Sequence, residues 1–231
     1  MSNSEVSVLS AGAVEPGMTK VIDSFRRETG HDVKVTFATA PAILKRIGDA
    51  NIAAVVVAPR AVLDEWVKAG KAASATRVTV GRIGVGVMVQ DGAPLPKIGT
   101  VDDFKQSLLS AESIVYNQAS TGIYLETLFD RLGIAERLKT KTTRYPDAAA
   151  VLNHVGKGKR NEIGLGAVTV IIEGEGKGLK FVGPLPAEIQ NYTVYAAIVV
   201  ADGVAPDSAQ EFVRYLTSPA AKKAFASAGI E

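Results

Sequence analysis

Short apolar runs alternate with amphipathic segments along the first third of the chain. Apart from Ser7, residues 6–9 are β-branched and aliphatic, and the small residues 10–13 follow them, so the pattern predicts a buried strand that ends in a turn. A helix over residues 18–29 is predicted next, because one face of it would carry Met18, Val21, Ile22 and Phe25. Gly30 supplies the stop signal for this helix. The segment therefore predicts one βα unit.

The same pattern occurs twice more before residue 70. A strand is predicted at "DVKVTF" (32–37), with the turn "ATAP" and the helix "AILKRIGDA" behind it. The run "AAVVVA" (53–58) is apolar without interruption, as expected of a strand covered by helices on both faces. A helix closed by Gly70 follows this run. Three βα units in succession predict an open, mostly parallel α/β sheet.

A second set of units follows. Residues 81–92, "GRIGVGVMVQDG", are predicted as one long strand punctuated by glycines. Further strands are predicted at 113–117, 162–168, 178–186 and 191–201, and helices at 101–109, 120–131, 147–158 and 208–229, the last interrupted at Ser218 and Pro219. This order predicts two α/β lobes. Their expected bounds are residues 1–83 with 190–231, and residues 84–189.

Composition narrows the possible functions. The 231 residues are 47% hydrophobic and 22% charged, which predicts a globular chain, and the net charge of +2 offers no basic field for nucleic acid. There is no cysteine, and the two histidines, His31 and His154, are far apart in sequence. We therefore expect no metal site, no cofactor and no nucleic-acid partner.

The N-terminus and the hydropathy pattern bear on location. "MSNSEVSVLSAGAVEPG" lacks the basic and apolar regions of a signal peptide, and no stretch reaches the ~20 apolar residues of a membrane span. The sequence as written therefore predicts a cytoplasmic protein without membrane insertion. A periplasmic location is expected instead if a leader was removed.

The turn in "YNQASTGIYLETLF" (116–129) has two interpretations. Serine and threonine before a helix are ordinary N-caps, and the same free N–H groups can bind an anion. Taken alone, the segment favours capping. The segment lies at a strand-to-helix turn, as do "LSAGAV" and "ATAP" in the first lobe, and this position favours anion binding.

Several segments together resemble a known family. They are "VLSAGAVEPGMTKVIDSFRRETGHDVKVTF", "PRAVLDEWVKAGK", "GRIGVGVMV", "YNQASTGIY" and "RNEIGLGAVTVI". In order and spacing they resemble the type II periplasmic solute-binding fold, and within it the molybdate-binding-protein-like group, over nearly the whole chain. The resemblance implies a two-lobe α/β protein with an interlobe cleft for a small anion, either a carboxylate or an oxyanion. It also implies an ABC transporter permease as the partner if the protein is exported.

The resemblance carries ligand contacts to particular positions of this chain. In the first lobe it implies Ser10, Ala11, Gly12, Thr39 and Ala40, and in the second lobe Ser120, Thr121, Gly122, and Ala167 or Thr169. A multiply charged ligand would also need a cation, and Arg82 at the crossover is the candidate. The alternative for Arg82 is a surface ion pair.

The turns "SAGAV" and "ATAP" lack the full serine pattern of molybdate binders and look closer to a subgroup that includes aconitate isomerase. This leaves a second function open, a cofactor-free isomerase of an unsaturated carboxylic acid. Such a reaction needs a base and an acid near the substrate. The catalytic candidates are Glu15 and Glu188 as bases and Tyr124 as a proton donor. His154 is a further possible base, and the other phenols that could donate are Tyr116, Tyr145, Tyr192 and Tyr195.

Overall fold

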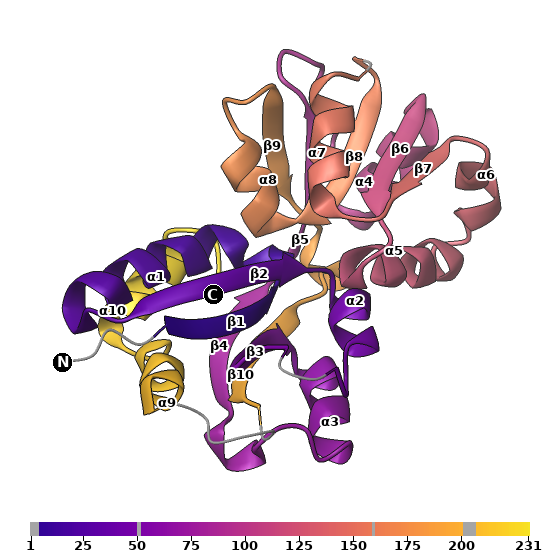
Figure 1. Cartoon of the computed structure of the whole chain (residues 1–231). Helices are drawn as coiled ribbons and strands as arrows, with labels where there is room; N and C mark the ends of the chain where they lie inside the picture. The colour runs from indigo at the N-terminus through magenta and orange to yellow at the C-terminus, as the bar shows by residue number, and fades with distance from the viewer. Residues whose placement is uncertain (1–4, 50–51, 159, 201–206) are drawn as a thin grey trace. The chain divides into compact units, whose positions relative to one another are not determined.

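The structure is a computed structural model that describes residues 5–49, 52–158, 160–200 and 207–231. The chain forms two compact units. Unit 1 comprises Met1–Ile83 and Thr193–Glu231, and unit 2 comprises Gly84–Tyr192. Each unit contains a five-stranded sheet with helices packed against it (Figure 1). The predicted two-lobe α/β class is confirmed.

Unit 1 has the strand order β2-β1-β3-β10-β4. The strands are β1 (Glu5–Ala11), β2 (Asp32–Ala38), β3 (Val55–Pro59), β10 (Thr193–Val199) and β4 (Val78–Ile83). β1 pairs in parallel with both β2 and β3, whereas β10 runs antiparallel to β3 and β4. The three parallel strands therefore end at the same edge of the sheet.

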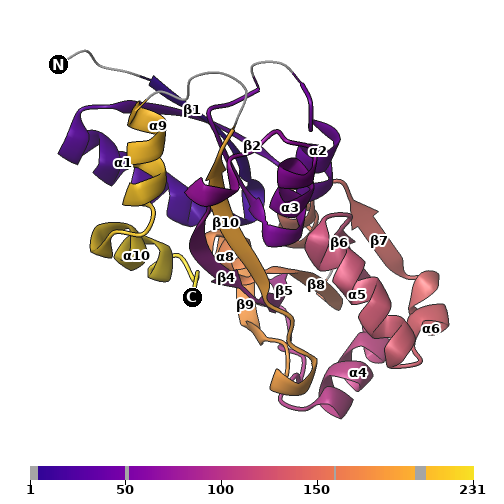
Figure 2. The same ribbon diagram turned by 90° about the horizontal axis from the view of Figure 1, so that it is seen from below.

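Helices cover both faces of this sheet. One face carries α1 (Glu15–Thr29), α9 (Asp207–Tyr215) and α10 (Pro219–Ala226), and the other carries α2 (Ala40–Lys45) and α3 (Arg60–Lys68), as Figure 2 shows. Two short 3₁₀ turns, η1 (Gly12–Val14) and η2 (Ser74–Thr76), complete the unit. Phe25 of α1 packs edge-on against Phe212 of α9, with ring centroids 5.1 Å apart. Uninterrupted apolar strands are thus buried on both faces, as the run at 53–58 indicated.

The predicted single strand over residues 81–92 is wrong. The structure has two strands there, β4 and β5 (Val85–Gln90), which belong to different sheets and are separated by Gly84. Gly81 has φ of 157° at a bulge of β4, and a Cβ on it would lie 2.8 Å from the carbonyl oxygen of Glu231. The glycines therefore mark a bulge and a change of sheet, and not one continuous strand.

Unit 2 has the strand order β7-β6-β8-β5-β9. The remaining strands are β6 (Ser113–Asn117), β7 (Thr142–Tyr145), β8 (Glu162–Ala167) and β9 (Leu179–Pro184). β6 pairs in parallel with β7 and β8, and β5 runs antiparallel to β8 and β9. Three adjacent parallel strands again end at one edge.

Two apolar clusters hold the helices of unit 2 to its sheet. The larger cluster includes Phe104, Leu125 and Leu138 from α4 (Val101–Ser110), α5 (Ser120–Arg131) and α6 (Ala135–Lys139). The smaller cluster includes Val155 and Ile171 from α7 (Ala148–Gly156) and α8 (Val168–Gly174). A 3₁₀ turn, η3 (Ala187–Ile189), lies near the end of the unit.

A polar network centred on the buried Glu162 joins four elements of unit 2. The Tyr145 hydroxyl lies 2.7 Å from Nδ1 of His154, whose Nε2 lies 3.0 Å from Oε2 of Glu162. Ser113 donates a short hydrogen bond to the same carboxylate oxygen. Glu162 is 3% exposed, and its Oε1 has no hydrogen-bond partner among the described residues. The network connects β7, α7, β8 and β6, and so fixes the place of α7 on the sheet.

Removing the carboxylate should destabilise unit 2. We expect Glu162→Ala to lower the free energy of unfolding by about 2 kcal/mol, because the hydrogen-bonding groups of Ser113 and His154 lose their shared partner. Urea denaturation measures the change. Glu112→Ala is the matched control, because this neighbouring side chain is exposed, and it should change stability by less than about 0.5 kcal/mol. Equal effects of the two substitutions would show that the network does not stabilise the fold.

Candidate functional site

The predicted contacts of unit 1 lie where its parallel strands end. Ser10 and Ala11 are the last two residues of β1, and Gly12 begins the turn η1. Thr39 and Ala40 stand at the junction of β2 and α2. Because β1 and β2 pair in parallel in register, with Ala11 opposite Ala38, the two turns are neighbours at one edge of the sheet.

Only some of these residues offer a surface to a ligand. Ser10 is fully buried, and its hydroxyl donates a long hydrogen bond of 3.4 Å to the carbonyl of Ala11, which is itself buried. Gly12 differs from both, because a Cβ placed on it would meet no atom within 4 Å. The open space at this turn is therefore beside the backbone of Gly12.

Thr39 is the N-cap of α2. Its Oγ1 accepts a hydrogen bond of 3.4 Å from the amide of Ala42. Pro41 occupies the first turn and has no N–H to offer. Because the Thr39 hydroxyl acts only as an acceptor in this cap, it can still donate a hydrogen bond to a second partner.

In unit 2 the helix α5 begins at Ser120, so Ser120 lies inside the helix and is not its N-cap. Its N-cap is Ala119, which makes no side-chain cap, and Ser120 and Thr121 are the first two helical residues. The interpretation of these two hydroxyls as caps is therefore wrong. The first intrahelical bond runs from Ile123 N–H to the Ala119 carbonyl, so the amides of residues 120–122 have no acceptor within the helix.

Asn117 stabilises this turn and was not among the predicted site residues. Its Oδ1 accepts a hydrogen bond of 3.0 Å from the amide of Ala119, which is an Asx turn at the end of β6. The side chain is buried. An asparagine directly after the apolar residues of a predicted strand was the signal that could have identified it.

Gly122 permits a very close approach of helix and strand. A Cβ on this residue would lie 1.7 Å from the carbonyl oxygen of Asn117, a distance that no side chain can occupy. Gly122 is therefore required for the packing of α5 on β6, whether or not its amide contacts a ligand. This packing sets the position of the Ser120 and Thr121 amides.

The second predicted turn of unit 2 joins β8 to α8. Ala167 is the N-cap of α8 and is buried, and Thr169 is fully buried in the first turn of that helix. Between them, the Val168 amide donates a hydrogen bond of 3.0 Å to the Gly84 carbonyl. Ligand contact by Ala167 or Thr169 remains a prediction.

Arg82 forms the surface ion pair that the sequence analysis gave as its alternative. Its Nη2 lies 2.8 Å from Oε2 of Glu231, and both side chains are about half exposed. Two backbone hydrogen bonds of 2.7 and 3.0 Å join the same two residues. Any ligand would have to compete with this carboxylate for the guanidinium.

The candidate catalytic groups lie in different surroundings. Glu15 is the first residue of α1, and Glu188 lies in η3; both are exposed. The Tyr124 hydroxyl donates a hydrogen bond of 2.6 Å to the Ile189 carbonyl, so it lies next to the segment that carries Glu188. Burial raises the pKa of the Tyr116 and Tyr195 phenols, which makes them weaker acids and disfavours the role of proton donor that was considered for them.

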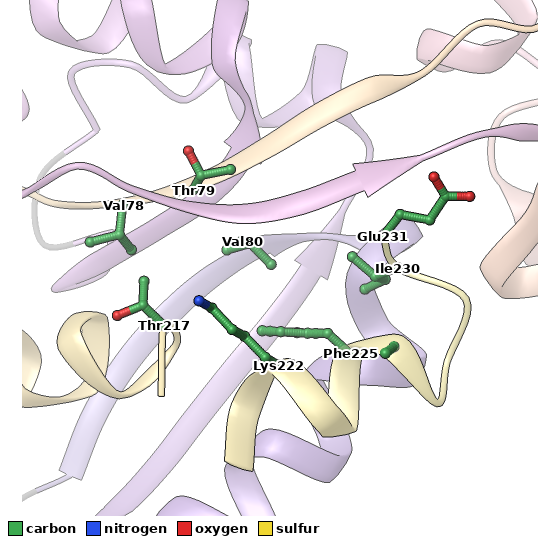
Figure 3. Close-up of a pocket in the computed structure, with 9 residues that line it drawn as sticks. Val78, Thr79, Val80, Thr217, Lys222, Phe225, Ile230 and Glu231 are labelled. Carbon is green, nitrogen blue, oxygen red and sulfur yellow. The ribbon is translucent and has the colours of Figure 1, made fainter. Parts of the chain in front are cut away.

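A pocket of about 670 Å³ lies elsewhere in unit 1, between β4 and α10 (Figure 3). Apolar side chains of Val78, Val80, Phe225 and Ile230 line it, and Lys222 extends along it. None of the predicted ligand contacts lines this pocket. It is therefore separate from the strand-end turns.

No group of three or more histidine and acidic side chains could hold a metal ion in the described ranges. None of the described helices is both long enough and apolar enough to cross a membrane.

Comparison with known proteins places this chain among solute-binding proteins. It is 31% identical to the aconitate isomerase of a Pseudomonas species, over 98% of this chain and 87% of that protein. It is 26% identical to the molybdate-binding protein ModA of Escherichia coli K12, over 96% of this chain and 86% of that protein. The solved periplasmic molybdate-binding protein of Azotobacter vinelandii shares the fold, with a TM-score of 0.82, 16% identity and 98% of each chain covered.

Residues 6–231 match the family described as bacterial extracellular solute-binding protein. The match covers nearly the whole chain and both units. This protein belongs to the bacterial extracellular solute-binding protein family.

Proposed function

We propose that the protein binds a small carboxylate or oxyanion through N–H and hydroxyl donors at its strand-to-helix turns. The observation that carries the proposal is the first turn of α5. There the amides of Ser120 and Thr121 have no acceptor within the helix, and neither hydroxyl is used as a cap. Family membership supports the binding of a solute.

The electrostatics of these turns suit an anion. A helix N-terminus carries roughly half a positive charge and free N–H donors, so it binds negative groups without a lysine or arginine. The names of two relatives also support an anionic ligand, because one is a molybdate-binding protein and another is named for the tricarboxylate aconitate. The small net charge of the chain is no obstacle, because these donors act locally.

A transport role is the first use we propose for this binding. The family is described as extracellular, which supports a location outside the cytoplasm for the protein at work. In that role it delivers its ligand to the permease of an ABC transporter.

A cofactor-free isomerase is the second candidate, because the chain shares more identity with an aconitate isomerase than with ModA. This reaction moves a double bond when a base removes a proton and an acid returns one at another carbon. Glu15 and Glu188 are the exposed carboxylates proposed as bases, and the Tyr124 hydroxyl donates a hydrogen bond to a backbone carbonyl. Ultraviolet absorbance of cis- and trans-aconitate during incubation with the protein separates the two functions, since only an isomerase changes it.

A thermal-shift screen tests anion binding directly. We expect at least one of molybdate, sulfate, citrate, cis-aconitate and trans-aconitate to raise the melting temperature. A ligand at 100 times its dissociation constant stabilises the folded state by about 2.7 kcal/mol. Sodium chloride at matched ionic strength is the control. If no anion raises the melting temperature above that control, the proposed function is wrong.

Ser120→Ala and Thr121→Ala should weaken anion binding and leave the fold stable. Since neither hydroxyl caps α5, each substitution should change the free energy of unfolding by less than about 0.5 kcal/mol. Loss of one hydrogen bond to a charged ligand should weaken affinity about 10-fold or more. Calorimetric titration and urea denaturation give the two quantities. A stability loss of about 1 kcal/mol with unchanged affinity would identify a cap instead.

Two glycine substitutions should affect different properties, one the stability of the fold and the other the affinity for the anion. Gly122→Ala should destabilise the fold by about 3 kcal/mol or more, because the new Cβ overlaps the Asn117 carbonyl. Gly12→Ala should alter stability by less than about 0.5 kcal/mol, because the space beside Gly12 is open, yet it should weaken binding of an anion that approaches this backbone. Denaturation and titration of both variants check this contrast. Full anion affinity in Gly12→Ala would remove this turn from the ligand site.

A further inference from the structure

Arg60 occupies a place in unit 1 that the proposed function leaves unused. It is the first residue of α3 and directly follows β3. β3 pairs in parallel with β1, with Val57 opposite Ser10, so the end of β3 lies at the same edge of the sheet as Gly12. Neighbouring strands are about 4.8 Å apart, which is within the reach of an arginine side chain. Arg60 thus stands beside the turns that we propose to hold an anion.

The acidic side chains nearest to Arg60 along α3 are engaged by other cations. Asp64, four residues on, accepts a hydrogen bond of 2.7 Å from Arg77, and Glu65 lies 2.6 Å from Lys68. Arg60 is exposed, and its guanidinium makes no hydrogen bond or ion pair with any residue in the described ranges. Its guanidinium is therefore available to an outside anion.

The position of this charge also favours an outside anion. A cation in the first turn of a helix is repelled by the positive end of the helix dipole. An anion between Arg60 and the neighbouring turn would remove that repulsion. The planar guanidinium offers paired N–H donors that fit a carboxylate with two parallel hydrogen bonds.

We propose that Arg60 binds one carboxylate of a small di- or tricarboxylate ligand, while the strand-to-helix turns hold another. This inference rests on the proposed function and specifies its ligand class. A polycarboxylate carries charges several bonds apart, so it can satisfy a turn and a separate guanidinium together. A compact tetrahedral oxyanion has all its charge at one centre and gains little from a second, separate cation. Arg60 is thus a specificity-determining residue.

Calorimetric titration of the full chain with citrate, trans-aconitate and molybdate tests the role of Arg60. Arg60→Ala should weaken citrate or trans-aconitate binding about 10- to 100-fold and change any molybdate affinity by less than about twofold. Arg60→Lys should recover part of the loss, because it keeps the charge without the paired donors. Arg27→Ala is the matched control. It removes the same charge from an exposed arginine of α1 and should leave affinities unchanged.

The outcomes separate this inference from the proposed function. If the wild-type protein binds none of these anions or sulfate, the proposed function fails. If it binds citrate or trans-aconitate and Arg60→Ala matches Arg27→Ala, only the role of Arg60 fails. Preference of the wild-type protein for molybdate over both polycarboxylates, or an equal loss for all anions in Arg60→Ala, would also overturn the inference. Melting curves of each variant establish that it is folded.

Discussion

Parallel pairing of adjacent strands is the constraint on which the candidate site depends. In unit 1, β1 pairs in parallel with β2 and β3, and in unit 2, β6 pairs in parallel with β7 and β8. Parallel strands bring their carboxyl ends to one edge, and each chain must then turn into a helix whose first amides face outward. Gly12, Ser120 and Arg60, which we propose as ligand contacts, owe their positions to this arrangement, since each stands just beyond a strand.

Much of this arrangement could be predicted because it is local. β-Branched runs followed by small residues identified β1, β2 and β3, and the residues assigned to the turns do lie at strand ends. The spacing of Met18, Val21 and Phe25 likewise identified the buried face of α1. Periodicity and turn residues act within a few positions, so a single sequence displays them directly. The ligand contacts themselves stay predictions, because a turn looks alike with and without a ligand.

The features that could not be predicted depend on distant residues. The break at Gly84 follows from the pairing of β5 with β8 and β9, far along the chain. The cap position at Ala119 follows from the side chain of Asn117 and from the close approach of Gly122 to the backbone of β6. In the polar network, Ser113 lies far from Glu162 in sequence and beside it in the fold. No local pattern reports such contacts.

The pairing of Glu231 with Arg82 has a consequence for the behaviour of the protein in concentrated solution. β4 is the edge strand of its sheet, and exposed edge strands recruit strands from other molecules. Two backbone hydrogen bonds and an ion pair hold Glu231 across part of that edge. Glu231 therefore covers part of this edge and hinders the pairing of β4 with strands of other molecules. Loss of this pairing would expose the backbone of β4 to strands of other molecules, and the expected result is self-association.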